Sequence, residues 1–225
     1  MLQGLMQDAP LLVSGILQYA ARAHGEREIV SKLVDESVWR YDWRSCDQRS
    51  RQAAQALGVL GVATGDRVSS LAWNTHRHLE LFYAIPGMGA VLHTANPRLS
   101  DEQIAFTIEH AGSRVLLFEP NLAELVARLR PLLPGIEHYV LLAERAAFVP
   151  DLADALNYEA LLAHEDGALA WPSFDEKAAA FLCYTSGTTG DPKGVLYSHR
   201  SIVLHAMAAG LSSAFGFSAF DVIMP

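Results

Sequence analysis

The segment of residues 185–194 carries the side chains in this sequence that are best suited to binding and chemistry. It reads Thr-Ser-Gly-Thr-Thr-Gly-Asp-Pro-Lys-Gly, so four hydroxyl residues, three glycines and one lysine occupy ten positions. Glycine lets the backbone approach a ligand closely, hydroxyl groups donate hydrogen bonds to phosphate oxygens, and Lys193 adds a mobile positive charge. We therefore predict a flexible cradle for an anion, suited to a polyphosphate that is held and released in each cycle.

Three other readings of the glycine-containing segments fail on residue order. A Walker A loop has glycine directly before its lysine and Ser or Thr after it, whereas Pro192 precedes Lys193 and Gly194 follows it. Residues 87–89 (Gly-Met-Gly) lack the third glycine of a dinucleotide-binding fingerprint, and no G-x-S-x-G elbow is present. A plain Ser/Thr/Gly surface loop is disfavoured, because such a loop rarely joins a buried strand to a Pro-Lys-Gly exit.

The elements around this segment can be predicted from apolar periodicity. Residues 178–184 form a continuous apolar run and are predicted to be a buried strand that leads into it. Residues 195–197 are predicted as a strand and residues 201–214 as a helix. From residue 66 onward strands and helices alternate. The predicted strands are 67–72, 90–94, 114–118 and 138–142, and the predicted helices are 78–88, 101–110 (opened by Ser100) and 122–129.

This alternation predicts an α/β fold with a mostly parallel sheet flanked by helices. Residues 1–65 are expected to form N-terminal helices and a hairpin packed on the domain, and residues 66–225 an α/β sheet subdomain that ends in the segment 185–194 and the next helix. Residues 150–173 interrupt the alternation of strands and helices and are predicted to be a surface excursion. In the first part, helices are predicted at 12–23 and 43–60, and hairpin strands at 29–34 and 38–41.

Composition narrows the class of protein. The chain has 225 residues, 51% of them hydrophobic, and a net charge of -8 that no run of one sign dominates. Nucleic acid is therefore not expected as a partner. Cys46 and Cys183 stand alone, outside any C-x-x-C pair, which favours a reducing, cytoplasmic setting. No apolar run reaches membrane-spanning length, so no integral membrane segment is expected.

Several aromatic and histidine residues have simpler structural explanations than a site. His76 and His78 could form a metal pair, but without a third ligand they are predicted to lie at a solvated helix start. His205 is predicted to be packed. Trp39 and Tyr41, with Trp43, are expected to pack the N-terminal hairpin.

Residues 184–194, read in order, resemble the phosphate-binding signature of the adenylate-forming superfamily, which comprises acyl- and aryl-CoA synthetases, luciferases and adenylation domains of peptide synthetases. Residues 65–68 (Gly-Asp-Arg-Val), 71–74 (Leu-Ala-Trp-Asn) and 87–99 are similar to bacterial medium- and long-chain fatty-acyl-CoA synthetases. The resemblance runs through nearly the whole chain. It implies the N-terminal domain portion of the adenylate-forming fold.

The resemblance also implies a reaction and a set of site residues. In this family ATP and Mg²⁺ activate a fatty acid as its acyl-adenylate, and coenzyme A then displaces AMP. Thr185 is the candidate for the hydroxyl that contacts the metal. Residue 199 resembles a histidine common beside the family's loop, and for His199 ligand contact and a structural role both stay open. The residues that the resemblance assigns to the ATP phosphates are Thr185, Ser186, Gly187, Thr188, Thr189, Gly190 and Lys193.

The sequence leaves alternatives open. The phosphate signature is shared with aryl-CoA ligases and adenylation domains, although His93 to Arg98 favours fatty acids. A non-catalytic reading is a folded scaffold that binds nucleotide phosphates weakly or mediates dimerisation. In related synthetases the N-terminal end can contribute to dimer contacts, so a homodimer stays open. The acyl chain length also stays open, because a hydrophobic pocket discriminates modestly per methylene.

The resemblance implies that further family motifs should follow residue 225: an aromatic-rich motif ending in Thr-Glu, an aspartate for the ribose, a hinge, and a lysine on a mobile C-terminal domain. We therefore expect residues 1–225 alone not to complete the reaction. The measurement is thioester formation by this chain in the presence of ATP, Mg²⁺, a fatty acid and coenzyme A. Turnover that depends on both ATP and coenzyme A would contradict the expectation.

Overall fold

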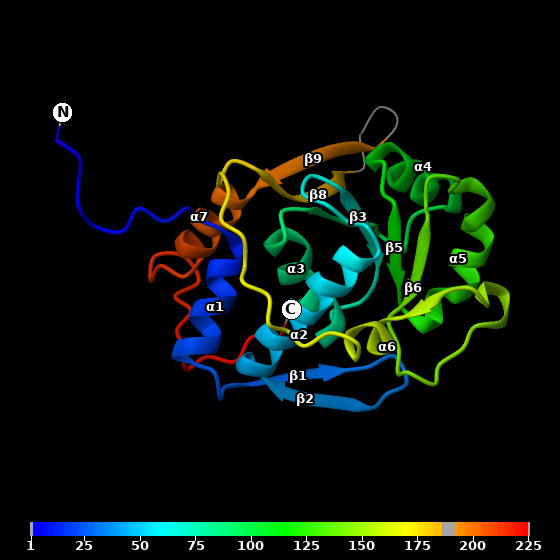
Figure 1. The fold of residues 1–225 in the computed structure, drawn as a ribbon, viewed down its shortest axis with the longest axis horizontal. Coiled ribbons are helices and arrows are strands. Elements are labelled where there is room, and N and C mark those ends of the chain that lie inside the picture. Colours follow the sequence, from blue (N-terminus) through cyan, green and yellow to red (C-terminus); the bar gives the residue numbers. More distant parts are fainter. Residues whose placement is uncertain (1, 186–191, 225) are drawn as a thin grey trace.

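A computed structural model describes residues 2–185 and 192–224. Within these residues a seven-stranded sheet has the spatial order β7-β6-β5-β3-β4-β8-β9, and a two-stranded hairpin, β1-β2, lies apart from it (Figure 1). Neighbouring strands from β7 to β8 run parallel, and β9 runs antiparallel to β8. The predicted α/β fold with a mostly parallel sheet is thereby confirmed.

Most of the elements begin and end within two residues of the predicted positions. The strands are β1 (Glu28–Lys32), β2 (Val38–Asp42), β3 (Arg67–Leu71), β4 (Val91–Thr94), β5 (Val115–Phe118), β6 (His138–Leu141), β7 (Leu156–Asn157), β8 (Ala179–Thr185) and β9 (Lys193–Ser198). The α-helices are α1 (Val13–Ala23), α2 (Trp43–Val59), α3 (His76–Gly87), α4 (Asp101–Ala111), α5 (Ala123–Leu129), α6 (Tyr158–Leu162) and α7 (His199–Ala209).

Each face of the sheet is covered by its own layer of helices. Helices α2, α3 and α6 pack on one apolar cluster and α4 and α5 pack on a second. Strand β5 serves both clusters, because its side chains alternate: Val115 and Leu117 join the first, and Leu116 and Phe118 join the second. All four are buried, as expected for a parallel strand covered on both faces.

A buried ion network holds α6 against α2 and α3. The guanidinium of Arg49 donates to Glu80 Oε1 at 2.7 Å and to Glu159 Oε1 at 2.9 Å, and Tyr158 Oη donates to Glu80 Oε2 at 2.8 Å. Burial raises the pKa of the Glu159 carboxyl, but the nearby His76 ring and hydrogen bonds from arginine side chains outweigh burial and hold it well below its usual value. Removing any one partner from such a network would leave a buried charge uncompensated, which is strongly destabilising.

The predicted surface excursion at residues 150–173 is wrong in part. Strand β7 pairs in parallel with β6 through Leu156 and Asn157, and Tyr158 and Leu162 of α6 are buried. A strand of two residues is too short to show a period of two in the sequence. Its pairing with β6, and not its local sequence, therefore determines that these two residues form a strand.

The helix predicted at residues 201–214 begins earlier and ends earlier. Ser198 caps α7, accepting a hydrogen bond from the Ser201 N–H at 3.2 Å, and the helix ends at Ala209, directly before Gly210. Glycine in a helix interior costs about 1 kcal/mol relative to alanine, so the helix stops there. The packed position predicted for His205 is also wrong, because this side chain is exposed on α7.

The solvated helix start predicted for His76 and His78 is wrong. Both side chains are buried, and α3 begins at His76. The His76 ring stacks on Trp39 of the hairpin at 4.8 Å and meets Tyr41 edge-on at 5.8 Å. The prediction that Trp39 and Tyr41 pack the hairpin is thus confirmed, with His76 as their partner on the domain.

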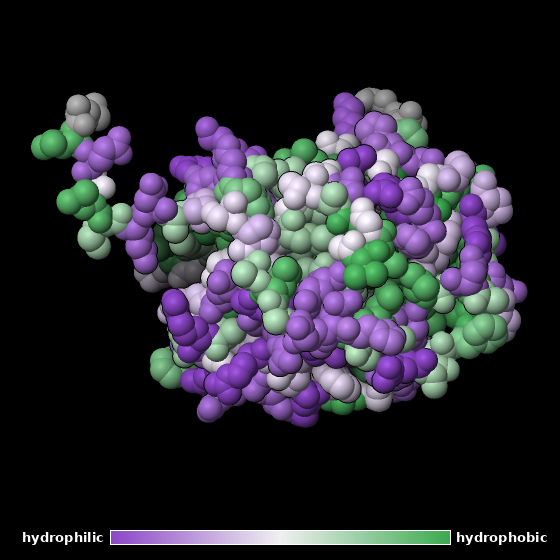
Figure 2. All heavy atoms as spheres, viewed as in Figure 1, coloured by the Kyte–Doolittle hydropathy of each residue, from purple (hydrophilic) through white to green (hydrophobic). Residues whose placement is uncertain are grey.

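No helix among residues 2–185 and 192–224 has the length and apolar character needed to cross a bilayer. Hydrophilic side chains are spread over the face drawn in Figure 2 and are not gathered into one stripe. The segment before α1 extends away from the rest of the molecule (Figure 1).

The connection between α6 and β8 is held to the helical layer by Trp171. Its indole Nε1 donates to Asp47 Oδ1 at 3.3 Å, and the Arg51 guanidinium lies 5.3 Å from the ring centre. The ring also fills the space beside Gly87, where an added Cβ would lie 2.5 Å from a ring carbon. Only glycine at residue 87 therefore allows this approach.

We expect Gly87→Ala to destabilise the protein, because the new methyl group displaces the Trp171 ring from its contacts. Overpacking of this kind costs about 1–3 kcal/mol. Gly58→Ala is the matched control, since Gly58 also lies near a helix end but has no neighbour within 4 Å of an added Cβ. The free energy of unfolding of Gly58→Ala should rise by up to about 1 kcal/mol. Urea unfolding measures the free energy of unfolding of both variants. Equal effects of the two substitutions on it would refute the packing argument.

Candidate functional site

The two ends of the predicted phosphate loop, residues 185–194, lie side by side at the carboxyl edge of the parallel strands. Thr185 ends β8 and Lys193 begins β9, and the two residues are register partners in the antiparallel pair. Both side chains are exposed. Among the described residues no carboxylate forms an ion pair with the Lys193 ammonium. An anion held at this end would therefore meet a hydroxyl and a cation on adjacent strands.

The central residues of the predicted site, Ser186, Gly187, Thr188, Thr189 and Gly190, lie outside the described residues. Of the residues assigned to phosphate, the structure thus places only Thr185 and Lys193. Pro192, directly before Lys193, is half-buried.

A second set of polar groups lies at the carboxyl ends of β3 and β5. The indole Nε1 of Trp73 donates to Asn121 Oδ1 at 3.2 Å, and Thr75 Oγ1 donates to Glu119 Oε1 at 2.9 Å. Burial raises the pKa of the Glu119 carboxyl. The connections from β3 and β5 leave in opposite directions along the sheet, which is where ligands bind in many open α/β sheets. Here the hydrogen bonds link the two strand ends directly to each other.

Sequence reasoning missed a buried hydrogen-bond chain on the α4 side of the sheet. Ser69 Oγ lies 2.7 Å from Ser113 Oγ and 2.7 Å from His93 Nδ1. All three side chains are buried, and burial lowers the pKa of His93 to about 4. Ser69 sits in the middle of a strand whose other buried positions include Val68 and Leu71. A buried serine in such a strand is the signal that could have indicated a polar partner.

The remaining singled-out residues have structural roles in the described part of the chain. His199 Nδ1 accepts the Val13 N–H at 3.1 Å, which joins α7 to α1, so the structure favours the structural role that the sequence left open. Burial raises the pKa of the Cys46 thiol to about 12, which makes it a poor nucleophile. Cys183 is half-buried, with its Sγ 3.8 Å from Thr94 Oγ1.

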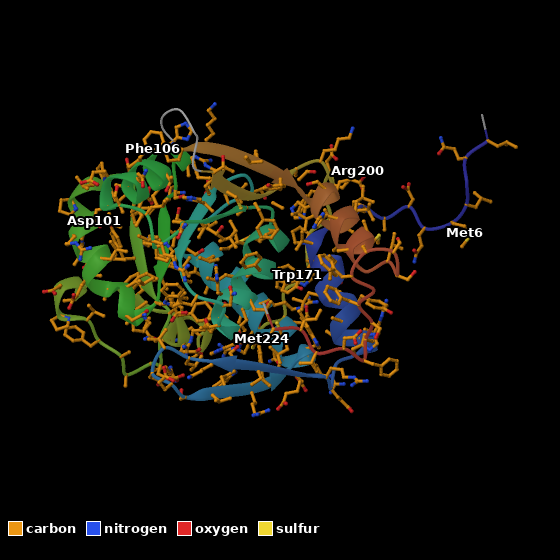
Figure 3. All side chains as sticks on the ribbon, turned by 180° about the vertical axis from the view of Figure 1, so that it is seen from behind. Met6, Asp101, Phe106, Trp171, Arg200 and Met224 are labelled. Atoms are coloured by element: carbon orange, nitrogen blue, oxygen red, sulfur yellow. The ribbon has the colours of Figure 1, made fainter. Side chains whose placement is uncertain are left out.

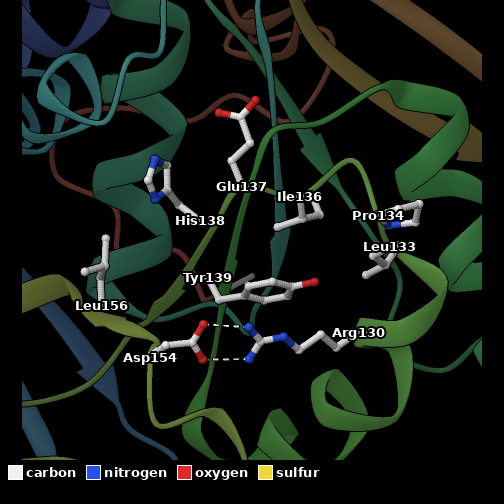
Figure 4. Close-up of a pocket in the computed structure, with 9 residues that line it drawn as sticks. All are labelled: Arg130, Leu133, Pro134, Ile136, Glu137, His138, Tyr139, Asp154 and Leu156. Carbon is white, nitrogen blue, oxygen red and sulfur yellow. Dashed lines mark hydrogen bonds and ion pairs between the residues drawn. The ribbon is translucent and has the colours of Figure 1, made fainter.

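A surface cavity of about 210 Å³ lies at the opposite, amino edge of the sheet, at the start of β6 and β7 (Figure 4). Arg130 and Asp154 face each other across it through two hydrogen bonds of 2.6 and 2.5 Å, and the guanidinium lies 5.0 Å from the Tyr139 ring centre. The two charges neutralise each other. The cavity is also smaller than most ligand pockets, at roughly 300 Å³ or more, and none of the predicted site residues lines it.

The structure shows an α/β protein in which the two ends of the predicted phosphate loop lie at the carboxyl edge of the sheet. The sequence pattern of the AMP-binding enzyme family matches residues 17–224. The chain belongs to this family. The resemblance drawn from residues 184–194 is thereby confirmed.

Curated relatives match almost the whole chain. It is 46% identical over 223 residues to a 3-methylmercaptopropionyl-CoA ligase of Ruegeria lacuscaerulensis, covering 99% of the chain and 41% of the relative. It is 42% identical over 226 residues to a medium-chain-fatty-acid–CoA ligase of Ectopseudomonas oleovorans, with 99% and 41% covered. Identity to a long-chain-fatty-acid–CoA ligase of Thermus thermophilus is 45% over 220 residues, with 98% and 39% covered. The chain thus spans about two fifths of the length of these relatives.

Solved structures agree on the fold. An anthranilate CoA ligase in complex with anthranoyl-AMP superposes with a TM-score of 0.79 at 24% identity, covering 92% of this chain and 39% of that one. A Brucella canis acyl-CoA synthetase gives 0.79 at 16% identity, covering 97% and 39%. These similarities show that the chain shares the fold of the matched portions of these two enzymes.

Buried histidines make the stability of this domain depend on pH. Burial lowers the pKa values of His78 and His93 from 6.5 to about 4. The unfolded chain therefore binds more protons between these two values, and the free energy of unfolding should fall as the pH drops from 6.5 toward 4.

Urea unfolding at about pH 7, 6 and 5 tests this expectation, at pH values above the ordinary pKa values of carboxyl groups. His93→Gln should flatten the dependence, because it removes one of the groups that titrate on unfolding. The exposed His205→Gln is the control and should behave like the wild type. The same pH dependence in all three proteins would contradict the assignment to His93.

Proposed function

We propose that the protein to which this chain belongs activates a fatty acid with ATP as an acyl-adenylate and transfers the acyl group to coenzyme A. Family membership and the relatives named as fatty-acid–CoA ligases support this proposal. The observation that carries it in the structure is the pairing of Thr185 with Lys193 at the carboxyl edge of the sheet. This pairing puts a hydroxyl and an ammonium group at the two ends of a loop with phosphate-binding composition.

Within this proposal the loop holds the β- and γ-phosphates of ATP. Glycine backbone and hydroxyl groups donate hydrogen bonds to the phosphate oxygens, and Lys193 offsets their charge. An exposed lysine with no carboxylate partner in the described residues keeps its charge available for the ligand. The proposed phosphate-binding residues are Thr185, Ser186, Gly187, Thr188, Thr189, Gly190 and Lys193.

The chemistry follows from the poor reactivity of a carboxylate. In the first step a carboxylate oxygen forms a bond to the α-phosphorus of ATP, and the bond to pyrophosphate breaks. In the second step the thiolate of coenzyme A attacks the acyl carbon, and AMP leaves with the bonding electrons. A loop of hydrogen-bond donors and one lysine can stabilise the negative charge on the departing pyrophosphate.

The described residues are compatible with Mg²⁺ bound through the nucleotide. Mg²⁺ prefers oxygen ligands and usually keeps waters while binding one or two protein groups together with substrate phosphates. The described residues contain no group of three or more His, Cys, Asp or Glu side chains able to enclose a metal. The exposed Thr185 hydroxyl at the loop entrance is the proposed protein ligand. When bound, the ion supplies positive charge against the phosphate oxygens.

A second candidate substrate comes from the relatives. Two 3-methylmercaptopropionyl-CoA ligases of Ruegeria species are 46% and 43% identical to the chain, so a short thioether acid is the alternative to a fatty acid. Comparing kcat/KM of the complete protein for the two acids separates these candidates. The cytoplasmic location and the homodimer remain predictions.

The nucleotide proposal is tested by calorimetric titration of this chain with Mg-ATP. Lys193→Ala and Thr188→Ala should each weaken binding, because they remove a cation and a donor from the phosphates; charge-assisted hydrogen bonds are worth about 1.5–3 kcal/mol each. Lys177→Ala is the matched control, since Lys177 is an exposed lysine that precedes β8 at its amino end. Equal affinities in the Lys193 and Lys177 variants would refute the phosphate role of Lys193.

A further inference from the structure

Tyr184, the residue before Thr185, is held by two histidines from different elements. Its hydroxyl lies 2.7 Å from His110 Nδ1 on α4. Its ring centre lies 5.0 Å from that of His93 on β4, with the planes inclined by 65°. Edge-to-face geometry of this kind is favourable between aromatic rings. The Tyr184 side chain thus links β8 to the helix and the strand beside it.

The third side of the Tyr184 ring is closed by β9. Gly194 is its register partner, and a Cβ added to Gly194 would lie 3.3 Å from Tyr184 Cζ and 3.1 Å from Leu182 Cδ1. The absence of a side chain at residue 194 therefore leaves room for the ring across the strand pair.

Helix α4 holds His110 in a fixed place. A capping box between Ser100 and Gln103 begins the helix, and Gly112 ends it in the left-handed conformation with φ of 63°. The Arg67 guanidinium donates to the Ala111 carbonyl at 2.8 Å and to the Gly112 carbonyl at 3.1 Å, which ties the helix end to β3.

The ring of His110 is also stacked. It lies on Phe106, one helical turn earlier, with ring centres 5.4 Å apart and planes inclined by 20°. Figure 3 shows Phe106 at the end of the molecule where the β8–β9 pair meets α4. On the other side of Tyr184, the hydrogen-bond chain from Ser113 through Ser69 orients His93. Both histidines are therefore positioned by groups outside the loop.

We propose that Tyr184 is a positioning residue: held by His93, His110 and the space at Gly194, it fixes the end of β8 and thereby Thr185 at the entrance of the phosphate loop. This inference rests on the proposed nucleotide function for its purpose, although the contacts themselves are independent of it. A hydroxyl that must meet a phosphate or a metal has to be held within about half an ångström. The side chain that precedes it supplies that constraint.

The contact between Tyr184 and His110 is suited to this task because a phenol can donate or accept a hydrogen bond. The phenol donates to Nδ1 when this nitrogen carries no proton, and the phenol oxygen accepts when Nδ1–H donates. The positioning contact is therefore possible in either tautomer of His110.

The inference is tested by amide hydrogen exchange of the 225-residue chain without ligand, with Mg-ATP titrations in parallel. Tyr184→Phe keeps the ring and removes only the hydroxyl, and His110→Ala removes its partner. Both should raise exchange at residues 183–185 and 193–195 by roughly 2- to 10-fold, as for loss of one hydrogen bond. The double variant should add little to either single change. His110→Gln should rescue the exchange rates, because an amide can bond to the phenol.

Tyr197→Phe is the matched control, since Tyr197 lies on the same strand pair and its hydroxyl has no hydrogen-bond partner among the described residues. Mg-ATP affinity should fall by a similar factor in the first two variants and not in this control. Unchanged exchange near the loop in Tyr184→Phe and His110→Ala overturns the inference, as does faster exchange with unchanged Mg-ATP affinity. If the wild type itself binds no Mg-ATP, the proposed nucleotide function of this chain fails, and the exchange rates alone decide the role of Tyr184.

Discussion

Strand β8 must satisfy two different pairings at once, and the rest of the candidate site depends on this constraint. Its N–H and C=O groups pair in parallel with β4 on one side and antiparallel with β9 on the other. Unpaired backbone groups in a buried strand are costly, so β8 has little freedom to shift its register. As a result Thr185 comes to the carboxyl edge of the sheet, opposite Lys193.

The helices on both faces of the sheet pack against the strands and hold them in place. On one face α4 packs on the sheet and brings His110 to Tyr184, while on the other face the Arg49, Glu80 and Glu159 network fixes α6 against α2 and α3. The buried charges and hydrogen bonds have defined partners, which specifies one arrangement of helices. The predicted phosphate loop is thus attached, at Thr185, to a strand that is paired on both sides.

Relatives in this family differ in the acid for which they are named. Relatives that share the fold are named for different acids, from 3-methylmercaptopropionate to long-chain fatty acids. A shared fold therefore supports the common phosphate chemistry better than it supports one acid. The cavity beside Arg130 lies at the edge of the sheet away from Thr185, so within residues 2–185 and 192–224 it offers no acid pocket next to the loop.

The sequence alone determined the α/β alternation, the buried strand before the loop and the phosphate-type composition of residues 185–194, because periodicity and residue type are local properties. The start of α4 also followed from its cap residue, Ser100. The assignments of Ser186 to Gly190 stay predictions, because these residues lie outside the described part of the chain. Only the tertiary structure decided the pairing of the two-residue β7, the burial of His76 and the contacts of Tyr184. Each of these depends on residues far apart in sequence, and no local pattern encodes which distant side chain will fill a given space.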